Sequence, residues 1–435
     1  YGFGADREAI NEIVFNTSMV GYQEILSDPS YTDQMVVMTY PLIGNYGTAE
    51  EDYETKFPTI GGMIVREYND SPSNFRYTKT LNEVFEEHDI PAIWGVDTRT
   101  LTRIIRNEGT QKVIITGADT PLEEALRKVR EYALPHDMVS RVSCRKRWFS
   151  RTPNHRWDVV AVDCGIKYNI IRKLNEKGCN VTVVPFDASV EEILDSPNIN
   201  LVVEVINDPD AAYDIVKRSM LRGIPVVSGS KTMLARHLPE LIELQKTRHV
   251  ALLYDASSCG SIPVIRNLEE YYDNDLLLEV KGILNGSSNY ILSRVFDHAE
   301  PYADALAQAQ ALGFAESDPS FDIEGYDSLF KLVIITVHAL GTYVAPERIF
   351  TYGISTIHDS DIRYAREKNV KIKLVAQVVK VSDEHFTMFV MPEFVTPDKY
   401  IYSVDDEYNG VVIRGECYDR QFMFGKGAGS LPTAS

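Results

Sequence analysis

A regular alternation of short β-branched runs with helical patterns between residues 157 and 254 constrains the fold more than any other sequence feature. The first helical pattern repeats apolar residues every fourth position and stops at Gly178. Strands are expected at 159–162, 181–184, 201–206, 224–228 and 250–254. Strands and helices that alternate at this spacing predict a doubly wound parallel, Rossmann-like sheet, which we expect to run without a break through this whole region.

The region before this alternation has a different pattern. Short β-rich runs at 13–15, 35–40, 63–67 and 113–116 are separated by turn residues. A helix is expected over 101–107, with Asp97 or Thr98 as its N-cap and Gly109 as its stop. We therefore predict an N-terminal α+β domain over residues 1–150. Gly2 and Gly4 have no strand before them and are expected to form a hairpin turn.

Beyond Ser257 the pattern becomes longer strands and helices, including helices expected at 302–312 and 326–340. The overall fold class is then α/β and α+β, with a third, C-terminal α+β domain. The expected domains are 1–150, 157–257 and 258–435.

Composition narrows the classes of partner. Lys and Arg total 44 against 63 Asp and Glu, and the net charge of -19 disfavours nucleic acid. The dense basic stretch has no aromatic ladder for stacking bases and is interpreted as a solvated linker; it contains Arg141, Arg145, Lys146, Arg147, Arg151 and Arg156. No apolar run is long enough to cross a bilayer. Five cysteines without a CxxC pair favour a reducing, cytoplasmic location.

Several blocks of the first half resemble the small, glutamine-hydrolysing subunit of carbamoyl phosphate synthetase. The blocks are Ile13–Tyr31, Thr39–Gly47, Gly95–Arg103 and Val160–Ile171, and the likeness continues to about Leu194. In that family the first domain docks on the large subunit, which makes residues 1–150 a candidate docking module. The resemblance makes Ser30 a remnant of a glutamine-binding site, and a plain Asp-Pro-Ser turn is the alternative.

The amidotransferase core of that family is missing from the sequence. There is no Asn-Gly-Pro-Gly-Asp-Pro loop, no Gly-x-Cys-x-Gly elbow and no later His-Pro-Glu. Acyl transfer from glutamine needs an activated thiolate with a histidine base, and Cys259 lies in Ser-Ser-Cys-Gly without that context. We therefore expect no glutaminase activity.

From about Glu192 to its end the sequence resembles homoserine dehydrogenase. The blocks that carry this resemblance are Val226–Lys231, Tyr254–Ser257 with Ile262–Arg266, Gly282–Leu292 and Leu312–Lys331. The closing Gly425–Ser435 fits the same family and stops inside its final segment, so the third domain is expected to be truncated. The two resemblances meet at a join between about residues 186 and 199, and the chain is interpreted as a chimera.

The chemistry of that family explains the residue types in these blocks. Oxidising a hydroxyl removes its proton while hydride leaves the same carbon, so a lysine must exchange that proton at close range. Lys331 follows Asp327 by four residues, so both face the same way on a helix; a surface ion pair is the alternative. The resemblance makes Lys231 a second catalytic lysine and places Glu316, Asp322 and Asp327 around the substrate. We expect these groups to converge.

The cofactor implied by the resemblance is NADP or NAD, with Gly165, Ser230 and Gly427 as the matching binding positions. A dinucleotide fold needs Gly-x-Gly-x-x-Gly after its first strand, whereas this chain has Asp163-Cys-Gly165-Ile. Weak binding is therefore expected. The resemblance also implies a monovalent cation, for which Asp255 is the matching residue.

Two functions remain open from the sequence. One is a homoserine dehydrogenase-like oxidoreductase impaired at its cofactor turn, with a homodimer formed through the dehydrogenase half. The alternative is a fragment of the synthetase small subunit that docks the large subunit through residues 1–150.

Overall fold

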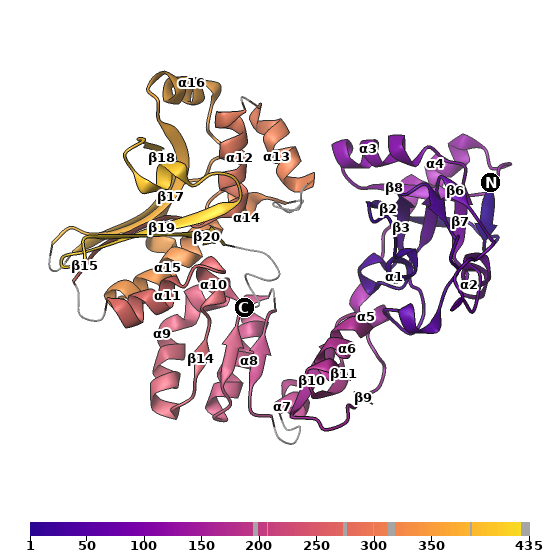
Figure 1. The fold of residues 1–435 in the computed structure, drawn as a ribbon, viewed down its shortest axis with the longest axis horizontal. Helices are drawn as coiled ribbons and strands as arrows, with labels where there is room; N and C mark the ends of the chain where they lie inside the picture. The colour runs from indigo at the N-terminus through magenta and orange to yellow at the C-terminus, as the bar shows by residue number, and fades with distance from the viewer. Residues whose placement is uncertain are drawn as a thin grey trace. The chain divides into compact units, whose positions relative to one another are not determined.

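The computed structural model of the chain describes residues 1–194, 199–206, 208–272, 276–298, 300–311, 318–382 and 385–427. The chain divides into two compact units, Tyr1–Ile199 and Asn200–Ser435 (Figure 1).

The first unit is built on a six-stranded sheet in the order β1-β7-β5-β3-β2-β8. Its strands are β1 (Gly2–Gly4), β2 (Ala9–Asn16), β3 (Gln34–Met38), β5 (Gly62–Val65), β7 (Pro91–Trp94) and β8 (Gln111–Ile115). The central four strands are parallel, and β1 and β8 run antiparallel at the edges. Alternate residues of β3 enter different cores, with Val36 and Met38 in one and Met35 and Val37 in the other.

Short elements surround this sheet. The helices are α1 (Tyr22–Leu26), α2 (Leu81–Glu87), α3 (Thr98–Glu108), α4 (Leu122–Glu131), α5 (Met138–Val142) and the 3₁₀ turns η1 (Pro29–Tyr31) and η2 (Glu50–Asp52). Strands β4 (Leu42–Ile43) and β6 (Glu67–Tyr68) pair with each other. The predicted caps of α3 are confirmed, because Asp97 accepts a hydrogen bond from the Thr100 amide and Gly109 follows the last turn.

The expected hairpin turn at Gly2 and Gly4 is wrong. These residues are in strand β1, which pairs antiparallel with β7, so that Phe3 lies opposite Ala92. The Phe3 ring stacks on Tyr68 with ring centroids 4.0 Å apart. The pairing partner lies about ninety residues later in the sequence, which the local Gly-x-Gly pattern does not reveal.

The predicted strand-helix-strand motif after Trp157 is confirmed. It consists of β10 (Trp157–Asp163), α6 (Tyr168–Glu176) and β11 (Cys179–Pro185); β9 (Trp148–Ser150) pairs with β11, and α7 (Val190–Leu194) follows. The buried Glu54 holds this motif against the N-terminal domain, because its carboxylate accepts from the Asn169 amide at 3.0 Å and its carbonyl from the Tyr168 amide at 2.7 Å. Arg172 also donates to the Tyr53 carbonyl at 3.0 Å.

The second unit opens with a parallel three-stranded sheet in the order β12-β13-β14. Its elements are β12 (Val202–Glu204), α8 (Pro209–Leu221), β13 (Val226–Ser228), α9 (Lys231–Arg248) and β14 (Leu252–Leu253). Met220 of α8 and Leu234 of α9 pack with Val226 of β13 in one core.

The expectation of one sheet running through the join is wrong. Among the described residues, β10 and β11 pair with each other and β9, while β12 pairs with β13, which gives two separate sheets. The unit boundary after Ile199 falls inside the domain expected over 157–257. The physical reason is that Glu54 and Arg172 bind the first motif to the N-terminal domain.

The rest of the second unit is an α+β domain around a six-stranded sheet in the order β16-β18-β17-β15-β19-β20. Its strands are β15 (Leu277–Ile283), β16 (Phe350–Thr351), β17 (Lys371–Lys380), β18 (Phe386–Val395), β19 (Tyr408–Gly415) and β20 (Arg420–Lys426). Its helices are α10 (Ala256–Cys259), α11 (Val264–Arg266), η3 (Asn267–Tyr271), α12 (Gly286–Asp297), α13 (Tyr302–Ala311), α14 (Ser320–Ile323), α15 (Tyr326–Leu340), η4 (Pro346–Arg348), α16 (Asp359–Glu367) and η5 (Tyr400–Ser403). Both α12 and α15 pack on β17 (Figure 1). In the described part of the chain, no helix is long and apolar enough to span a membrane.

Candidate active site

Helix α15 carries the pair that the sequence placed one turn apart. The helix begins after Gly325, whose positive φ of 86° suits glycine, and it puts Asp327 in its first turn. Lys331 Nζ donates to Asp327 Oδ2 at 2.7 Å. The side chains of Lys331 and Asp327 are only 9% and 2% exposed, so this is a buried pair and not a surface salt bridge.

A second contact fixes the ammonium group of Lys331. Its Nζ also donates to the carbonyl oxygen of Leu284 at 2.7 Å, just beyond β15. The same carbonyl accepts from Asn409 Nδ2 at 2.8 Å, which ties it to β19. Lysine has three N–H donors, so these two contacts leave one donor for another acceptor.

Asn285 links the acidic groups to helix α12. As the N-cap it accepts from the Ser288 amide at 2.8 Å through Oδ1, which uses the acceptor end of the amide. Its Nδ2 donates to Asp322 Oδ1 at 2.7 Å and to Asp327 Oδ2 at 2.9 Å. One side-chain amide therefore fixes the separation of two carboxylates.

Lys231 reaches the same carboxylate from the α/β part of this unit. It is the first residue of α9, which begins two residues beyond the end of β13, and its Nζ forms an ion pair with Asp327 Oδ1. Its ammonium lies 5.4 Å from the centre of the Phe321 ring. With its side chain 33% exposed, Lys231 is the more accessible of the two lysines.

Electrostatics hold the groups in definite states. Burial raises the pKa of Asp322, and the nearby Asp327 charge raises it further. Burial alone would also raise the pKa of Asp327, but Lys331 and then Lys231 outweigh it and lower that pKa. For Lys331, burial is outweighed by Asp327, so its pKa is raised. Asp327 is therefore ionised and Lys331 protonated at neutral pH.

Four of the five predicted active-site residues come together in this cluster: Lys231, Asp322, Asp327 and Lys331. Glu316 lies outside the described residues. The sequence reasoning missed Asn285 and the Leu284 carbonyl. The Asn-Gly-Ser context of Asn285 is typical of a helix N-cap, whereas a backbone carbonyl leaves no signal in the sequence.

The predicted cofactor positions are divided between the two units. Gly165 belongs to the first unit, while Ser230 and Gly427 belong to the second. Ser230 precedes α9, and its amide donates to Ser228 Oγ at 3.2 Å. Gly427 lies against Asn409, because a Cβ on Gly427 would come 1.9 Å from Asn409 Nδ2.

The turn at Gly165 does not fit a pyrophosphate. The amides of Gly165 and Ile166, which would face the phosphates, donate to Asp163 Oδ1 at 3.0 and 2.9 Å. The other carboxylate oxygen accepts from the Cys144 amide at 2.8 Å. A Cβ on Gly165 would lie 3.2 Å from Pro29, so the turn is also covered. An internal carboxylate fills the position that a ligand anion would need.

Asp255 offers one oxygen suited to a cation. Its Oδ1 is buried and has no hydrogen-bond partner in the described structure, while Oδ2 lies 3.2 Å from Arg266 Nε. No group of three or more His, Cys, Asp or Glu side chains is suited to a metal ion within the described ranges. A monovalent cation at Asp255 stays a prediction.

Among the residues that the structure describes, no glutaminase site is assembled around Cys259 or Ser30. Burial raises the pKa of Cys259 to about 12, which keeps the thiol protonated. Ser30 is exposed on η1, and its amide donates to Asp28 Oδ1 at 2.9 Å in an Asp-Pro-Ser turn. The role of Ser30 in binding glutamine stays a prediction.

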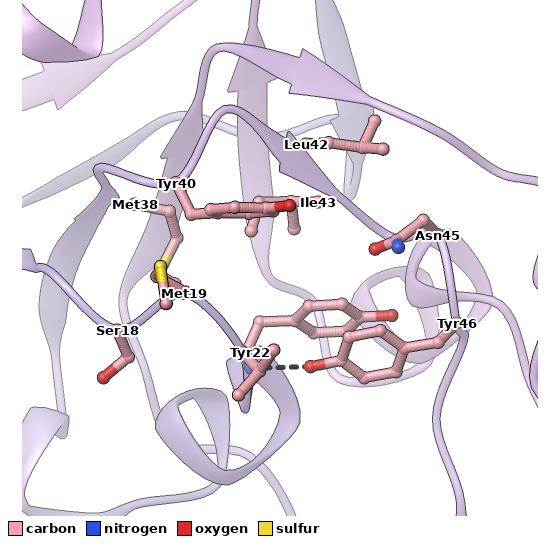
Figure 2. A pocket seen from close by; sticks show the side chains of 10 residues that line it. Ser18, Met19, Tyr22, Met38, Tyr40, Leu42, Ile43, Asn45 and Tyr46 are labelled. Carbon is pink, nitrogen blue, oxygen red and sulfur yellow. Dashed lines mark hydrogen bonds between the residues drawn. The ribbon is translucent and has the colours of Figure 1, made fainter.

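A small pocket in the first unit is part of the packing of two tyrosines (Figure 2). The rings of Tyr22 and Tyr46 stack with centroids 4.0 Å apart, and Tyr46 Oη accepts from the Tyr22 amide at 3.0 Å. The pocket has a volume of about 80 Å³, whereas sites for small molecules typically measure roughly 300–1,000 Å³. It is too small for a substrate of that kind.

Comparison with protein families gives two separate matches. Residues 1–115 match the carbamoyl-phosphate synthase small chain, CPSase domain. Residues 154–255 match the homoserine dehydrogenase NAD binding domain, and residues 263–435 match homoserine dehydrogenase.

Known proteins of similar sequence match the carbamoyl phosphate synthase part. The carbamoyl phosphate synthase small chain of Staphylococcus saprophyticus is 45% identical over 225 residues, which cover 52% of this chain and 60% of that protein. The corresponding protein of Fusobacterium nucleatum is 43% identical and is covered to 62%. This chain therefore spans about three fifths of the length of these relatives.

Solved structures resemble the other part. A homoserine dehydrogenase from Thiobacillus denitrificans is 29% identical with a TM-score of 0.57, covering 65% of this chain and 71% of that one. The Staphylococcus aureus enzyme is 25% identical with a TM-score of 0.54, covering 65% and 74%.

The two matches overlap in sequence. A match over 52% of 435 residues must reach past residue 199 wherever it begins, whereas the NAD binding domain match starts at residue 154. The chain therefore joins a region related to the carbamoyl phosphate synthase small chain to a region related to homoserine dehydrogenase.

Proposed function

We propose that the second unit carries the chemistry of a homoserine dehydrogenase, the interconversion of L-homoserine and L-aspartate 4-semialdehyde. The observation that carries the proposal is the buried Asp327 carboxylate, which contacts the ammonium groups of both Lys331 and Lys231. This reaction needs a group that takes up or gives a proton at the reacting oxygen, and a positioned lysine can do so.

The protonation states favour one direction of proton transfer. Asp327 raises the pKa of Lys331, so the lysine is protonated at neutral pH and its ammonium can donate a hydrogen bond to a carbonyl oxygen. The Leu284 carbonyl and Asp327 occupy two of its donors and orient the third. Lys231, which is more exposed, is the second group within reach of the substrate.

The carboxylates are suited to the substrate's amino group. Asn285 fixes Asp322 beside the lysine cluster, and the exposed fraction of Asp322 is intermediate, so one face of it is accessible. We assign the substrate ammonium to Asp322, with Glu316 as a further ligand on the strength of the family resemblance. Asp327 has the structural role of orienting the lysines.

Reduced or oxidised NAD(P) is the cofactor class that accords with this proposal. Residues 154–255 match an NAD binding domain, and an archaeal homoserine dehydrogenase of similar fold, 22% identical, was solved with NADPH. Because Asp163 fills the turn at Gly165, we expect weak binding. A monovalent cation at Asp255 belongs to the same proposal.

The test is to follow the nicotinamide absorbance with homoserine for the whole chain and for the variants K331M, K231M and K246M. The first two should lose at least about a hundredfold of whatever rate the chain shows, since general acid-base groups contribute roughly that much. Lys246 is exposed on the same helix as Lys231, so K246M should leave the rate unchanged. Full activity in K331M would remove the assignment.

A second function has its own observation. Residues 1–115 match the small-chain family and contain a complete six-stranded sheet, so we propose that residues 1–150 dock the large subunit of carbamoyl phosphate synthase. Co-purification of the full chain with that subunit, without glutamine hydrolysis, is the expected result.

Self-association through the dehydrogenase half accords with its exposed aromatic residues. Phe350 on β16, Phe394 on β18 and Phe424 on β20 are each at least half exposed on the C-terminal sheet. We propose a homodimer through this sheet. Light scattering of the full chain should give twice the monomer mass, and F394E should reduce it.

A further inference from the structure

Helix α3 presents a basic stripe in a chain that is acidic overall. Arg99, Arg103 and Arg106 are spaced at i, i+4 and i+7, which places them on one helix face, and all three are exposed. No ion pair involves them among the residues that the structure describes. The net charge of the chain is -19, so a cationic helix face of this length is not expected from the composition alone.

The stripe forms one wall of an open groove of about 970 Å³. Arg66, from the end of β5, supplies a fourth guanidinium. The remaining lining residues are Thr39, Pro41, Glu67, Asp97, Thr98 and Thr102. Asp97 partly offsets only Arg66, because their charged atoms lie 4.0 Å apart and Asp97 also caps α3.

Thr102 also lines the groove, although its hydroxyl oxygen is not exposed there. Its Oγ1 is buried and has no hydrogen-bond partner in the described structure. Thr102 lies between Arg99 and Arg103 in sequence and lines the same groove.

We propose that this groove, lined by Arg66, Arg99, Arg103 and Arg106, binds a carboxylate-rich surface of a partner protein. Guanidinium groups bind carboxylates through two parallel hydrogen bonds, and a stripe of two helical turns, about 10 Å long, exceeds a single small anion. The shape therefore suits several carboxylates on one helix or loop.

Nucleic acid fits the groove less well. The lining contains no aromatic side chain on which a base could stack. Glu67 and Asp97 lie inside the groove and would repel a continuous phosphate backbone, whereas separate carboxylates can avoid them.

The identity of the partner rests on the proposal that residues 1–150 dock the large subunit. The binding of carboxylates by the groove does not depend on that proposal. If residues 1–150 dock the large subunit, the groove is where an acidic patch of that subunit is expected. A short acidic peptide tests the groove itself, without the large subunit.

The experiment uses fluorescence anisotropy of a labelled twelve-residue glutamate-rich peptide with the full chain. The variant R99E/R103E/R106E should bind the peptide at least about tenfold more weakly, and the affinity of the native chain should fall as salt is raised. The neutral variant R99Q/R103Q/R106Q guards against misfolding and should also weaken binding. Circular dichroism verifies that both variants keep the fold.

The matched control reverses the same number of charges elsewhere. R145E/K146E/R147E alters three exposed residues of the basic linker and should leave peptide binding unchanged. Equal loss in that variant, or no peptide binding by the native chain, would overturn the inference. Tighter binding of a single-stranded oligonucleotide or tripolyphosphate than of the peptide would overturn it as well.

The large subunit then separates the two proposals. If the native chain binds the peptide through the groove but does not co-purify with the large subunit, the docking proposal fails and the groove stands. If the large subunit binds the native chain and the charge-reversal variant equally, the docking proposal stands and the groove is not its contact.

Discussion

The carboxylate of Asp163 accepts a hydrogen bond from the amide of Gly165 at 3.0 Å, across the turn that opens helix α6. In dinucleotide-binding folds the amides of this turn are left for the pyrophosphate. Here the same carboxylate also accepts hydrogen bonds from the amides of Ile166 and Cys144. The amides of the turn therefore already have an acceptor within the protein.

Replacing Asp163 should therefore damage the first unit without creating a cofactor site. D163A removes the acceptor of three amides and should destabilise this unit by about 1–3 kcal/mol. All three tryptophans, Trp94, Trp148 and Trp157, lie in the first unit, so tryptophan fluorescence during urea unfolding reports it selectively. D158A, an exposed position on the same strand, is the control.

Cofactor titration tests whether the turn at Gly165 binds NADPH or NADH. Because Pro29 covers Gly165, D163A should change NADPH affinity by less than about threefold, and the native chain should bind NADPH and NADH weakly. A loop carrying Gly-x-Gly-x-x-Gly in place of residues 163–169 should improve binding only if Pro29 moves away. Tight binding by the native chain would show that the cofactor uses another surface.

Removing the charge of Asp327 should strongly destabilise the second unit. D327N leaves Lys331 buried without its counter-charge, which should cost about 3–5 kcal/mol. Far-UV circular dichroism should show an earlier transition for the second unit, while tryptophan fluorescence stays unchanged. D304N, an exposed carboxylate on α13, should behave like the native chain.

The stability difference between the native chain and D327N should depend on pH in a defined way. The folded pKa of Asp327 is lowered, so its contribution is present above the unfolded pKa of about 3.9 and is lost as pH falls through the folded value. The raised pKa of Lys331 keeps its contribution present below about pH 10.4. Urea unfolding should give a constant difference from about pH 5 to 9 and a smaller one below about pH 4. A difference that grows on acidification would contradict this.

Local patterns predicted the local parts of the structure. The bounds of α15 follow from its apolar period and flanking glycines, and the i, i+4 spacing of Asp327 and Lys331 predicted their contact. The Leu284 carbonyl and Asn409 reach Lys331 from other parts of the chain, so no spacing rule could reveal them. These contacts are set by tertiary packing.

The sequence did not predict the break between the two parallel sheets, for a related reason. Strands and helices alternate on both sides of the join. Periodicity indicates whether an element is a strand or a helix, but not which strand it pairs with. Helix α6 contacts residues more than one hundred positions earlier, among them Glu54, and such contacts leave no signal in local periodicity.

Glu54 should therefore determine whether the motif β10-α6-β11 stays with the N-terminal domain. E54A removes the buried carboxylate that accepts hydrogen bonds from both the backbone amide and the side-chain amide of Asn169. The loss of about 1–3 kcal/mol should increase hydrogen exchange of the α6 amides about tenfold or more, while exchange in β3 and β5 stays slow. E51A is the matched control, because Arg172 contacts the Glu51 carbonyl and not its exposed carboxylate. Unchanged exchange in α6 of E54A would mean that another contact holds the motif in the first unit.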